Sequence, residues 1–270
     1  MTAPTGARCS PAFKDYVKAS GLGLVELSTA KEAENLLRQR EIDIGFVCGW
    51  YWMLGAELLN RVPLGYYGIH YSLLPKYRGF APLVWALING EKQVGLSLFR
   101  FSAGMDEGDI VRQMSLDVGD NDTIADVMQA LEDMSQTAVR EHWNLILNRT
   151  AVLTRQPAIG ATYGAQRRPE HGLIDWRLSA QRIHNFVRAQ APPYPGAFTS
   201  ADGKKIVILR TTVDSRTYYG TPGQIIERSD QGLLVTCGEA SALLVERLRT
   251  EAGESTARDG LKGTAALGGH

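Results

Sequence analysis

The stretch GIHYSLLPKYRG (residues 68–79) places a histidine two positions after a glycine and continues into Ser-Leu-Leu-Pro and an Arg-Gly pair. The overlapping run GYYGIHY (65–71) is rich in aromatic residues and predicts a strand. In an open α/β sheet, the chemistry usually lies at the carboxyl ends of the strands. His70 lies at such an end and is therefore a candidate catalytic residue, although a lone histidine near a strand end is more often structural.

The first half of the chain alternates β-rich runs with helical patterns, which is typical of βαβ units and a parallel sheet. GLVEL (23–27) and IDIGFVC (42–48) predict strands. Residues 28–40 between them predict a helix with Ser28 or Thr29 as its N-cap. The expected fold class is therefore α/β, with a parallel-sheet, Rossmann-like domain over residues 1–150.

Three more elements belong to this predicted domain. Residues 94–101 and 109–118 predict a strand pair around the loop SAGMDEGD. Residues 123–147 predict a long amphipathic helix capped by Asp122.

The pattern changes after residue 150. Residues 151–172 are rich in Gly, Pro, Gln and Arg and predict a linker. Residues 173–250 contain a short helix and strands at regular spacing, which predict a small C-terminal β-rich, OB-like domain. The tail, 251–270, is polar and rich in small residues, and we expect it to be disordered.

Charge and cysteine content narrow the classes of function. Lys plus Arg and Asp plus Glu are equal at 29 each, so no net charge attracts a phosphate backbone, and we expect no nucleic-acid partner. The three cysteines, Cys9, Cys48 and Cys237, are far apart, which fits a reducing compartment and predicts neither disulfides nor a metal site. No apolar run is long enough for a signal peptide or a membrane span, so we expect a cytoplasmic protein with no membrane partner.

Asp106, in the loop AGMDEGD between glycines, favours a catalytic role for His70 over a structural one. Glycines permit close backbone approach to a ligand, although such a loop can also be a plain solvated turn. A carboxylate held beside a histidine stabilises the imidazolium and fixes its tautomer, which suits a general base acting on an amine. Whether the two side chains meet is not readable from the sequence.

Residues 68–113 resemble the folate-dependent formyltransferases, which include methionyl-tRNA, glycinamide ribonucleotide and nucleotide-sugar N-formyltransferases. The family motif reads Asn-x-His-x-Ser-Leu-Leu-Pro and, later, Gly-Leu/Met-Asp-Thr-Gly. The matching positions here are Gly68, His70, 72–75 and 104–108. LIDWRLSAQRIHNFVRAQAPPYPGAF (173–198) resembles the C-terminal domain of the same enzymes, so the likeness covers roughly residues 20–245.

The resemblance implies an N-formyltransferase that moves a formyl group from N10-formyltetrahydrofolate to an amine. In this family an Asn amide and the His stabilise the developing oxyanion. The His, supported by its Asp partner, takes up the proton that the amine loses. His70 and Asp106 are therefore the expected catalytic residues. An oxyanion donor typically contributes about 10²–10³ in rate.

Two departures from the family pattern leave an alternative open. Gly68 stands where the family has Asn, so either Tyr67, Tyr71, Ser72 or a water replaces the amide donor, or turnover is slow, or the acceptor is unusual. We expect Gly68→Asn to raise transfer or leave it unchanged. Family members also open with a strand, helix and strand that this sequence lacks ahead of GLVEL, which predicts either a start upstream of Met1 or a degenerate relative. The alternative is a catalytically impaired relative that acts as a binding module.

Two sets of residues are the expected ligand contacts. The loop after residue 48 could line the donor's pteridine slot or simply pack in the core, and we favour the slot. The expected donor-binding residues are Trp50, Tyr51, Trp52, Met53, Gly104 and Met105.

The acceptor is expected to be a small-molecule amine. PPYPGAF (192–198) looks more like the sugar-formylating branch, so we predict an amine of a nucleotide-linked amino sugar, with hydroxyornithine or methionyl-tRNA as alternatives. Lys76, Arg78 and Tyr194 are the expected substrate-binding residues, although Arg78 with Gly79 could equally stabilise a loop. An exposed sheet edge would favour a homo-oligomer.

Overall fold

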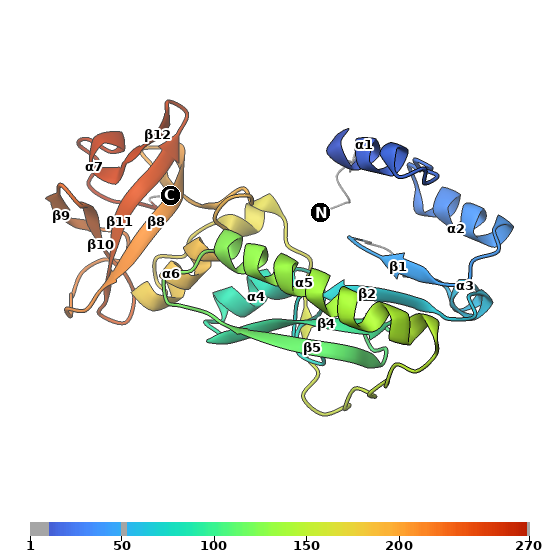
Figure 1. The fold of residues 1–270 in the computed structure, drawn as a ribbon. Helices are drawn as coiled ribbons and strands as arrows, with labels where there is room; N and C mark the ends of the chain where they lie inside the picture. Colours follow the sequence, from blue (N-terminus) through green and yellow to red (C-terminus); the bar gives the residue numbers. More distant parts are fainter. Residues whose placement is uncertain (1–10, 50–52, 269–270) are drawn as a thin grey trace.

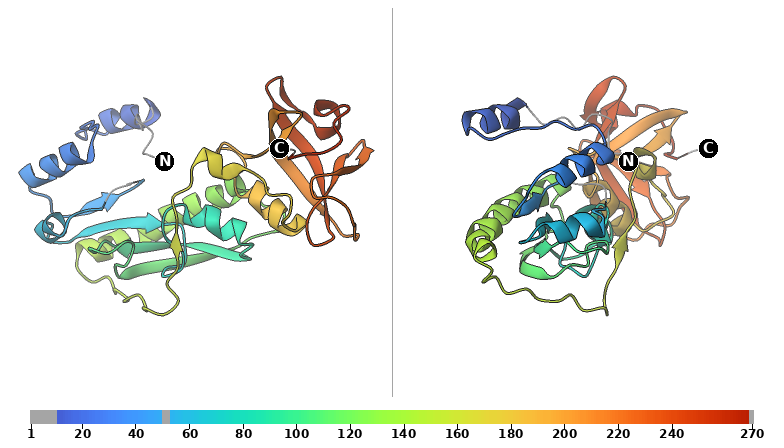
Figure 2. Two further views of the ribbon diagram at one scale, coloured as in Figure 1. Left: turned by 180° about the vertical axis from the view of Figure 1, so that it is seen from behind. Right: turned by 90° about the vertical axis from the view of Figure 1, so that its right-hand side faces the viewer.

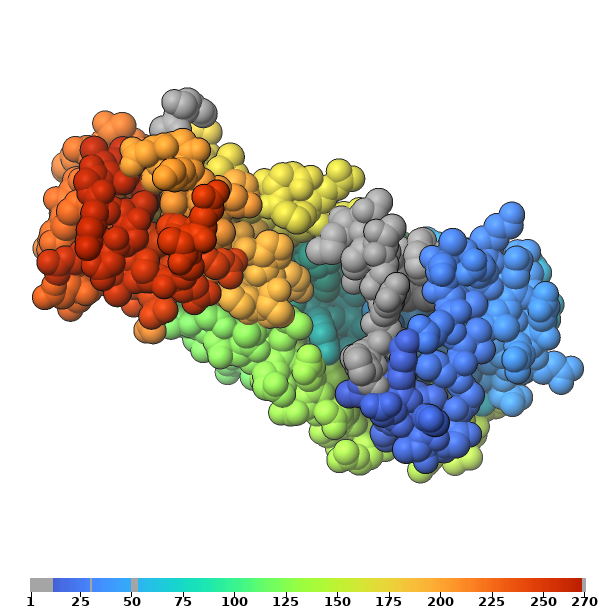
Figure 3. Space-filling model, turned by 90° about the horizontal axis from the view of Figure 1, so that it is seen from above, coloured from blue at the N-terminus to red at the C-terminus, as the bar shows by residue number. Residues whose placement is uncertain are grey.

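The computed structural model describes residues 11–49 and 53–268. These residues form an α/β domain joined to a smaller β-rich domain (Figure 1). Seen from above, the C-terminal domain and the N-terminal helices lie at opposite ends of an elongated molecule (Figure 3).

The sheet of the first domain has four strands in the order β1-β2-β4-β5. β1 (Gly45–Val47) and β2 (Tyr66–His70) are parallel, as predicted for a βαβ-type fold. β4 (Gln93–Arg100) runs antiparallel to β2, and β5 (Ile110–Asp117) runs antiparallel to β4. The predicted strand pair around the loop SAGMDEGD is therefore confirmed, and it makes the sheet mixed.

The two faces of this sheet have different coverings. Because side chains alternate along a strand, Leu96 and Leu98 of β4 face one way and Ser97 and Phe99 the other. Leu96 packs with α4 (Pro82–Ile88) and α5 (Ile124–Leu147) in one core cluster. His70 and Phe99 lie on the opposite face, with ring centroids 6.4 Å apart. That face carries the candidate site.

The N-terminal helices confirm one prediction and overturn another. α1 (Pro11–Ala19), α2 (Ala30–Gln39) and α3 (Ala56–Arg61) belong to the N-terminal part of this domain, and Leu37 of α2 and Leu59 of α3 pack in one cluster with Val47 of β1. Thr29 Oγ1 accepts from Glu32 N as the predicted N-cap of α2. The strand predicted at 23–27 is wrong. That segment has no strand partner among the described residues, and Leu24, Val25 and Leu27 are 39%, 52% and 42% exposed. Strand propensity alone does not make a strand without a neighbouring ladder.

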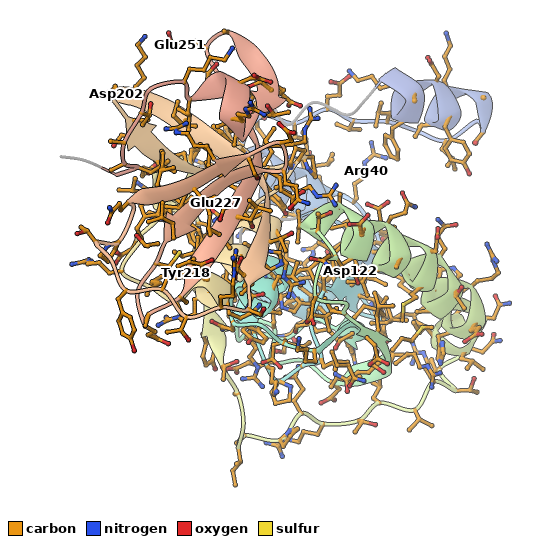
Figure 4. The ribbon with its side chains drawn as sticks, turned by 90° about the vertical axis from the view of Figure 1, so that its left-hand side faces the viewer. Arg40, Asp122, Asp202, Tyr218, Glu227 and Glu251 are labelled. Atoms are coloured by element: carbon orange, nitrogen blue, oxygen red, sulfur yellow. The ribbon has the colours of Figure 1, made fainter. Side chains whose placement is uncertain are left out.

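The cap of α5 is Thr123 and not the predicted Asp122. The Thr123 hydroxyl accepts from Asp126 N, and the Asp126 carboxylate accepts from Thr123 N at 2.8 Å, which is a reciprocal capping box. The Asp122 carboxylate instead accepts from the amide of Gly119 at 2.7 Å. Asp122 therefore stabilises the turn before α5, near the start of that helix in Figure 4.

The segment predicted as a linker runs along the first domain before it reaches the second. β3 (Arg78–Gly79) pairs in parallel with β6 (Tyr163–Gly164), and the 3-10 helix η1 (Pro169–Gly172) follows. Thr154 forms an isolated antiparallel bridge with Ile110. These pairings bring the segment close to the loops of the candidate site.

The predicted C-terminal β-rich domain is confirmed. α6 (Ala180–Arg188) precedes an antiparallel sheet with the order β7-β8-β11-β10-β9, and its strands are β7 (Ala197–Ala201), β8 (Lys204–Asp214), β9 (Ile225–Ser229), β10 (Gly232–Thr236) and β11 (Ala242–Thr250). Its core joins Ile183 of α6 to Ile208, Leu233 and Leu243 of the sheet. The views in Figure 2 show this domain packed at one end of the first domain, with α6 at the junction.

The prediction of a disordered tail is wrong for residues 251–268. β12 (Gly253–Thr256) pairs with β11, and α7 (Ala257–Gly260) follows it. Leu261 and Leu267 are only 5% and 3% exposed within the C-terminal core. A few apolar residues among small polar ones are enough to fold this segment, because β11 offers a free ladder edge.

In the described part of the chain, no helix combines the length and apolar character needed to cross a membrane.

Candidate active site

His70 and Asp106 come together as the sequence suggested. His70 Nδ1 lies 3.7 Å from Asp106 Oδ2, and both side chains are largely buried, at 11% and 20% exposure. His70 Nε2 lies 2.7 Å from the carbonyl oxygen of Tyr77. Because a carbonyl only accepts, Nε2 carries a proton. In the neutral ring, Nδ1 is therefore the free base, and it faces the carboxylate.

Asp106 is fixed by the backbone around it. Its Oδ2 accepts from the amide of Gly79 at 2.7 Å, and its own backbone is left-handed, with a φ of 51°. A left-handed non-glycine residue is unfavourable and persists only when its surroundings hold it there. Here the side chain of Gln156 donates to the Asp106 carbonyl oxygen at 2.7 Å.

A cavity of about 230 Å³ opens at this pair. Among the predicted donor-binding residues, Met53, Gly104 and Met105 line it. Trp50, Tyr51 and Trp52 lie outside the described residues. The remaining wall is mostly aromatic and apolar, contributed by Val47, Leu54, Ile69, Phe80, Phe99 and Phe101.

The position of the family's Asn is closed in this chain. A Cβ placed on Gly68 would come within 2.7 Å of the Phe101 ring and within 2.8 Å of the carbonyl oxygen of Val47. The register pairs Val47 with Gly68, so this oxygen belongs to the adjacent strand β1. The expectation that Gly68→Asn raises transfer or leaves it unchanged therefore meets a steric conflict, because the ring and a backbone oxygen occupy the space.

The hydroxyls considered as replacement donors are committed elsewhere or lie on other faces. Ser72 Oγ donates to the carbonyl oxygen of Lys76 at 2.6 Å. Tyr67 packs in a core cluster with Leu98, and Tyr71 packs against the cluster under α4 and α5.

Ser102 was missed at the sequence level. It lines the cavity, and its Oγ is buried with no hydrogen-bond partner among the described residues. A buried unpaired hydroxyl is unusual and suits a bond to a ligand. No motif singled it out; the only signal was its position two residues before Gly104.

The predicted substrate-binding residues are scattered. Arg78 is buried, and its guanidinium bonds to Gln156, Glu107 and Tyr163, which is the loop-stabilising role left open above. Lys76 is exposed on the surface, 3.8 Å from Glu91.

Tyr194 lines a second cavity of about 210 Å³ at the junction of the two domains. Phe80 lines both cavities, so the two adjoin. The walls of the second are Ala81, Val84, Pro169, Pro195 and Gly196, together with Gln166, Arg167, Arg168 and Gln190. The guanidinium of Arg167 lies 4.9 Å from the Trp85 ring centroid and 5.5 Å from that of Phe186, and burial lowers its pKa. Arg168, more than half exposed, lies at the rim, with its Nη1 3.9 Å from Glu170 Oε1.

Within residues 11–49 and 53–268, no cluster of three or more potential metal-ligating side chains is found. The fold and the facing histidine and aspartate indicate an α/β enzyme with a candidate acid–base pair at a ligand cavity.

Comparison with known proteins gives the family. Residues 13–142 match the model of the formyl transferases, and residues 167–264 match that of the formyl transferase C-terminal domain. The chain is 34% identical over 245 residues to the methionyl-tRNA formyltransferase of Anaeromyxobacter dehalogenans, covering 89% of this chain and 78% of that one. It is 33% identical over 239 residues to the same enzyme of Acetivibrio thermocellus, covering 87% and 76%. The chain belongs to the formyltransferase family, and it is an N-formyltransferase.

Solved structures show the same fold. One is the sugar 3N-formyltransferase WlaRD with dTDP and 5-N-formyl-THF, with a TM-score of 0.66, 18% identity, and coverage of 86% of this chain and 79% of that one. Another is the N-formyltransferase of Helicobacter canadensis with folinic acid and dTDP-3-aminofucose, with a TM-score of 0.66, 19% identity, and coverage of 86% and 81%. At these identities the likeness concerns the fold.

Proposed function

We propose that this protein transfers a formyl group from N10-formyltetrahydrofolate to an amine of a nucleotide-linked amino sugar. The observation that carries the proposal is His70 Nδ1 facing Asp106 Oδ2 at 3.7 Å in the wall of a cavity. This is the arrangement that an amine acceptor needs, because the attacking nitrogen must lose a proton.

In this proposal His70 is the general base. Its Nε2–H is held by the Tyr77 carbonyl, so Nδ1 receives the proton from the amine. The Asp106 carboxylate stabilises the resulting imidazolium electrostatically. Because the Gly79 amide holds Oδ2, the carboxylate does not turn away as the charge forms.

The lining of the cavity fits the proposed donor. N10-formyltetrahydrofolate supplies the one-carbon group. Its ring system packs well against aromatic rings and polarisable methionine side chains. Phe80, Phe99 and Phe101 provide rings, and Met53 and Met105 provide polarisable sulfur. The solved formyltransferases with dTDP and a formyl-folate or folinic acid support this assignment. Ser102 is the polar donor that the proposal adds to the predicted set.

We assign the acceptor to the second cavity. It adjoins the first at Phe80, is bordered by the PPYPGAF turn through Tyr194, and carries Arg168 at its rim. A cavity of about 210 Å³ suits one ring of a small molecule, and the exposed guanidinium of Arg168, which has only one of its nitrogens near Glu170, suits a phosphate. Arg78 is left out of this site because its guanidinium is already bonded. The chain's balance of 29 basic and 29 acidic residues also favours a small acceptor over tRNA.

A second candidate acceptor is methionyl-tRNA. The observation that favours it is the 34% identity to a methionyl-tRNA formyltransferase over most of both chains.

The free thiols of Cys48 and Cys237 suit the cytoplasm, where both candidate acceptors occur.

The test is an assay of tetrahydrofolate release from N10-formyltetrahydrofolate with a panel of dTDP- and UDP-linked amino sugars, and with methionyl-tRNA in parallel. The parent is expected to formylate at least one amino sugar, and His70→Ala is expected to lower kcat by about 10²–10⁴-fold. Turnover with methionyl-tRNA alone would replace the sugar assignment. Equal rates for the parent and His70→Ala would remove His70 from the mechanism.

A further inference from the structure

Gln156 lies in the segment between the two domains, yet its side chain is buried beneath the loop that carries Asp106. It is 7% exposed. Its Nε2 donates to the carbonyl oxygens of Asp106 and Gly108, both at 2.7 Å. Its Oε1 accepts from Arg78 Nε at 3.1 Å and from Nη2 at 2.8 Å. Carbonyls only accept and a guanidinium only donates, so the orientation of this amide is fixed and all its bonding capacity is used.

The backbone around Gln156 is anchored as well. Thr154 and Ile110 exchange two backbone hydrogen bonds, each of 2.8 Å. Ile110 begins β5, just beyond the Asp106 loop. Gln156 is therefore presented to that loop from a segment tied to the central sheet.

The strand β3 connects this network to both members of the pair. The amides of Arg78 and Phe80 donate to the carbonyl oxygens of Thr162 and Gly164. The amide of Gly79 points the other way and donates to Asp106 Oδ2. Residues 77–79 therefore contact all three side chains. The Tyr77 carbonyl oxygen is hydrogen-bonded to His70, the Gly79 amide to the Asp106 carboxylate, and the Arg78 guanidinium to Gln156.

We propose that Gln156 is a positioning residue for Asp106, so that the interdomain segment completes the active site. The φ of 51° at Asp106 is unfavourable for a side chain with a Cβ, and the two bonds from Gln156 to the carbonyls on either side of Glu107 restrain the loop in that form. Without them, the carboxylate loses its fixed distance from His70 Nδ1. Gln156 touches no reacting group and acts only through Asp106.

Hydrogen exchange at one amide reports this directly. Gln156→Glu keeps an oxygen for Arg78 but removes both N–H donors to the loop, and Gln156→Met removes every bond. Exchange is followed by NMR at Gly79, whose amide bonds to the Asp106 carboxylate. The amides of Arg78, in β3, and of Phe80, the residue after β3, serve as internal references.

In both variants the Gly79 amide is expected to exchange at least about tenfold faster, while the two reference amides change by less than about twofold. An unchanged Gly79 rate would overturn the proposal. Equal acceleration of all three amides would also overturn it, because Gln156 would then only support the whole segment.

A kinetic cycle tests the consequence for catalysis and rests on the proposed function. Gln156→Glu is expected to lower kcat by about 10–100-fold, as a small misplacement of a catalytic group does. In an Asp106→Asn background, the same change is expected to add less than about threefold. Equal losses in the two backgrounds would contradict a role through Asp106.

The matched control is Thr199→Val. Thr199 is buried in the C-terminal domain and accepts from Trp176 Nε1 at 3.0 Å, so this variant also loses one buried hydrogen bond. Its kcat is expected to stay within about twofold of the parent value. If the parent formylates no acceptor, the proposed function fails, while the exchange of the Gly79 amide still decides the role of Gln156.

Discussion

At the scale of single residues, the site is shaped by a glycine and its neighbour. Gly68 lies in β2, and the ring of Phe101 occupies the space where the Cβ of a side chain at this position would lie. Phe101 also lines the cavity. Because Gly68 has no side chain, the ring of Phe101 can lie against its backbone and form part of the cavity wall.

This close contact predicts that Gly68→Asn destabilises the protein by roughly 1–3 kcal/mol, the usual range for overpacking. The reason is the approach of a Cβ to the Phe101 ring and to the Val47 carbonyl oxygen. In a Phe101→Ala background, Gly68→Asn is expected to cause a smaller loss of stability, because the ring contact is gone and only the contact with the Val47 carbonyl oxygen remains. Urea unfolding measures the change for each variant against Phe101→Ala alone. Unchanged stability with increased formyl transfer for Gly68→Asn would contradict this prediction.

At the scale of elements, the capping box of α5 makes stability depend on pH. Hydrogen bonds from the Thr123 side chain and backbone hold the pKa of Asp126 below its usual value. A carboxyl group with a lowered pKa in the folded state adds stability above its unfolded pKa, and that stability is lost as pH falls through the folded value.

Asp126→Ala is therefore expected to destabilise the protein by about 0.5–1 kcal/mol near neutral pH, a modest value because the carboxylate is exposed. The difference from the parent should be constant from pH 5 to 8 and should shrink below the unfolded value of 3.8. Thermal melts at several pH values give this comparison. A difference that grows on acidification would rule out the capping box as its source.

The folded tail makes a second prediction at this scale. Leu261 follows α7 and is 5% exposed, whereas the neighbouring Lys262 side chain is 79% exposed. Leu261→Ala is expected to lower the free energy of unfolding by about 2–5 kcal/mol. The matched control Lys262→Ala is expected to stay within about 0.5 kcal/mol of the parent. Similar behaviour of the two variants in denaturant would mean that the tail does not pack as described.

These elements also show what the sequence could and could not predict. The strands at 94–101 and 109–118 were predictable because each carries enough local pattern and a short connecting loop. The segment 23–27 has the same propensity but no ladder neighbour among the described residues, and the tail folds only because β11 offers an edge. Those two outcomes depend on distant partners, which a local pattern does not contain.

The site divides in the same way. His70 and Asp106 were predictable because a short motif surrounds each of them. Gln156 contacts Asp106 across 50 residues of sequence and Arg78 across 78, and no local motif marks it. Arg78 was predicted either to bind substrate or to stabilise a loop, and the sequence could not decide between the two because its partners Gln156 and Tyr163 lie far along the chain.

At the scale of the whole molecule, α6 joins the two domains. His184 on α6 is hydrogen-bonded through Nδ1 to Thr211 of β8 and through Nε2 to the carbonyl oxygen of Asp120, in the turn before α5. Arg188, one turn further, donates through Nη1 to the carbonyl oxygens of Gly119 and Asp122. The turn 119–122 of the first domain is thus bonded to a helix that packs in the core of the second.

Arg188 is the cation that this junction depends on. It is 4% exposed, and burial lowers its pKa, partly offset by the charges of Asp120 and Asp122. Arg188→Met removes the bonds to both carbonyl oxygens, of which that of Gly119 keeps its bond from Asp122 N at 3.3 Å, and the change is expected to cost roughly 1–3 kcal/mol. Because these bonds cross between the domains, the loss also weakens the coupling of their unfolding.

Calorimetry is expected to show one cooperative transition for the parent, and for Arg188→Met a lower midpoint with a broadened or divided transition. Arg182→Met, on the exposed face of the same helix, is the matched control and should melt within about 1–2 °C of the parent. If Arg188→Met melts in a single transition at the midpoint of the parent, the junction does not couple the domains. The second cavity, whose walls come from both domains, would then have to keep its shape without that coupling.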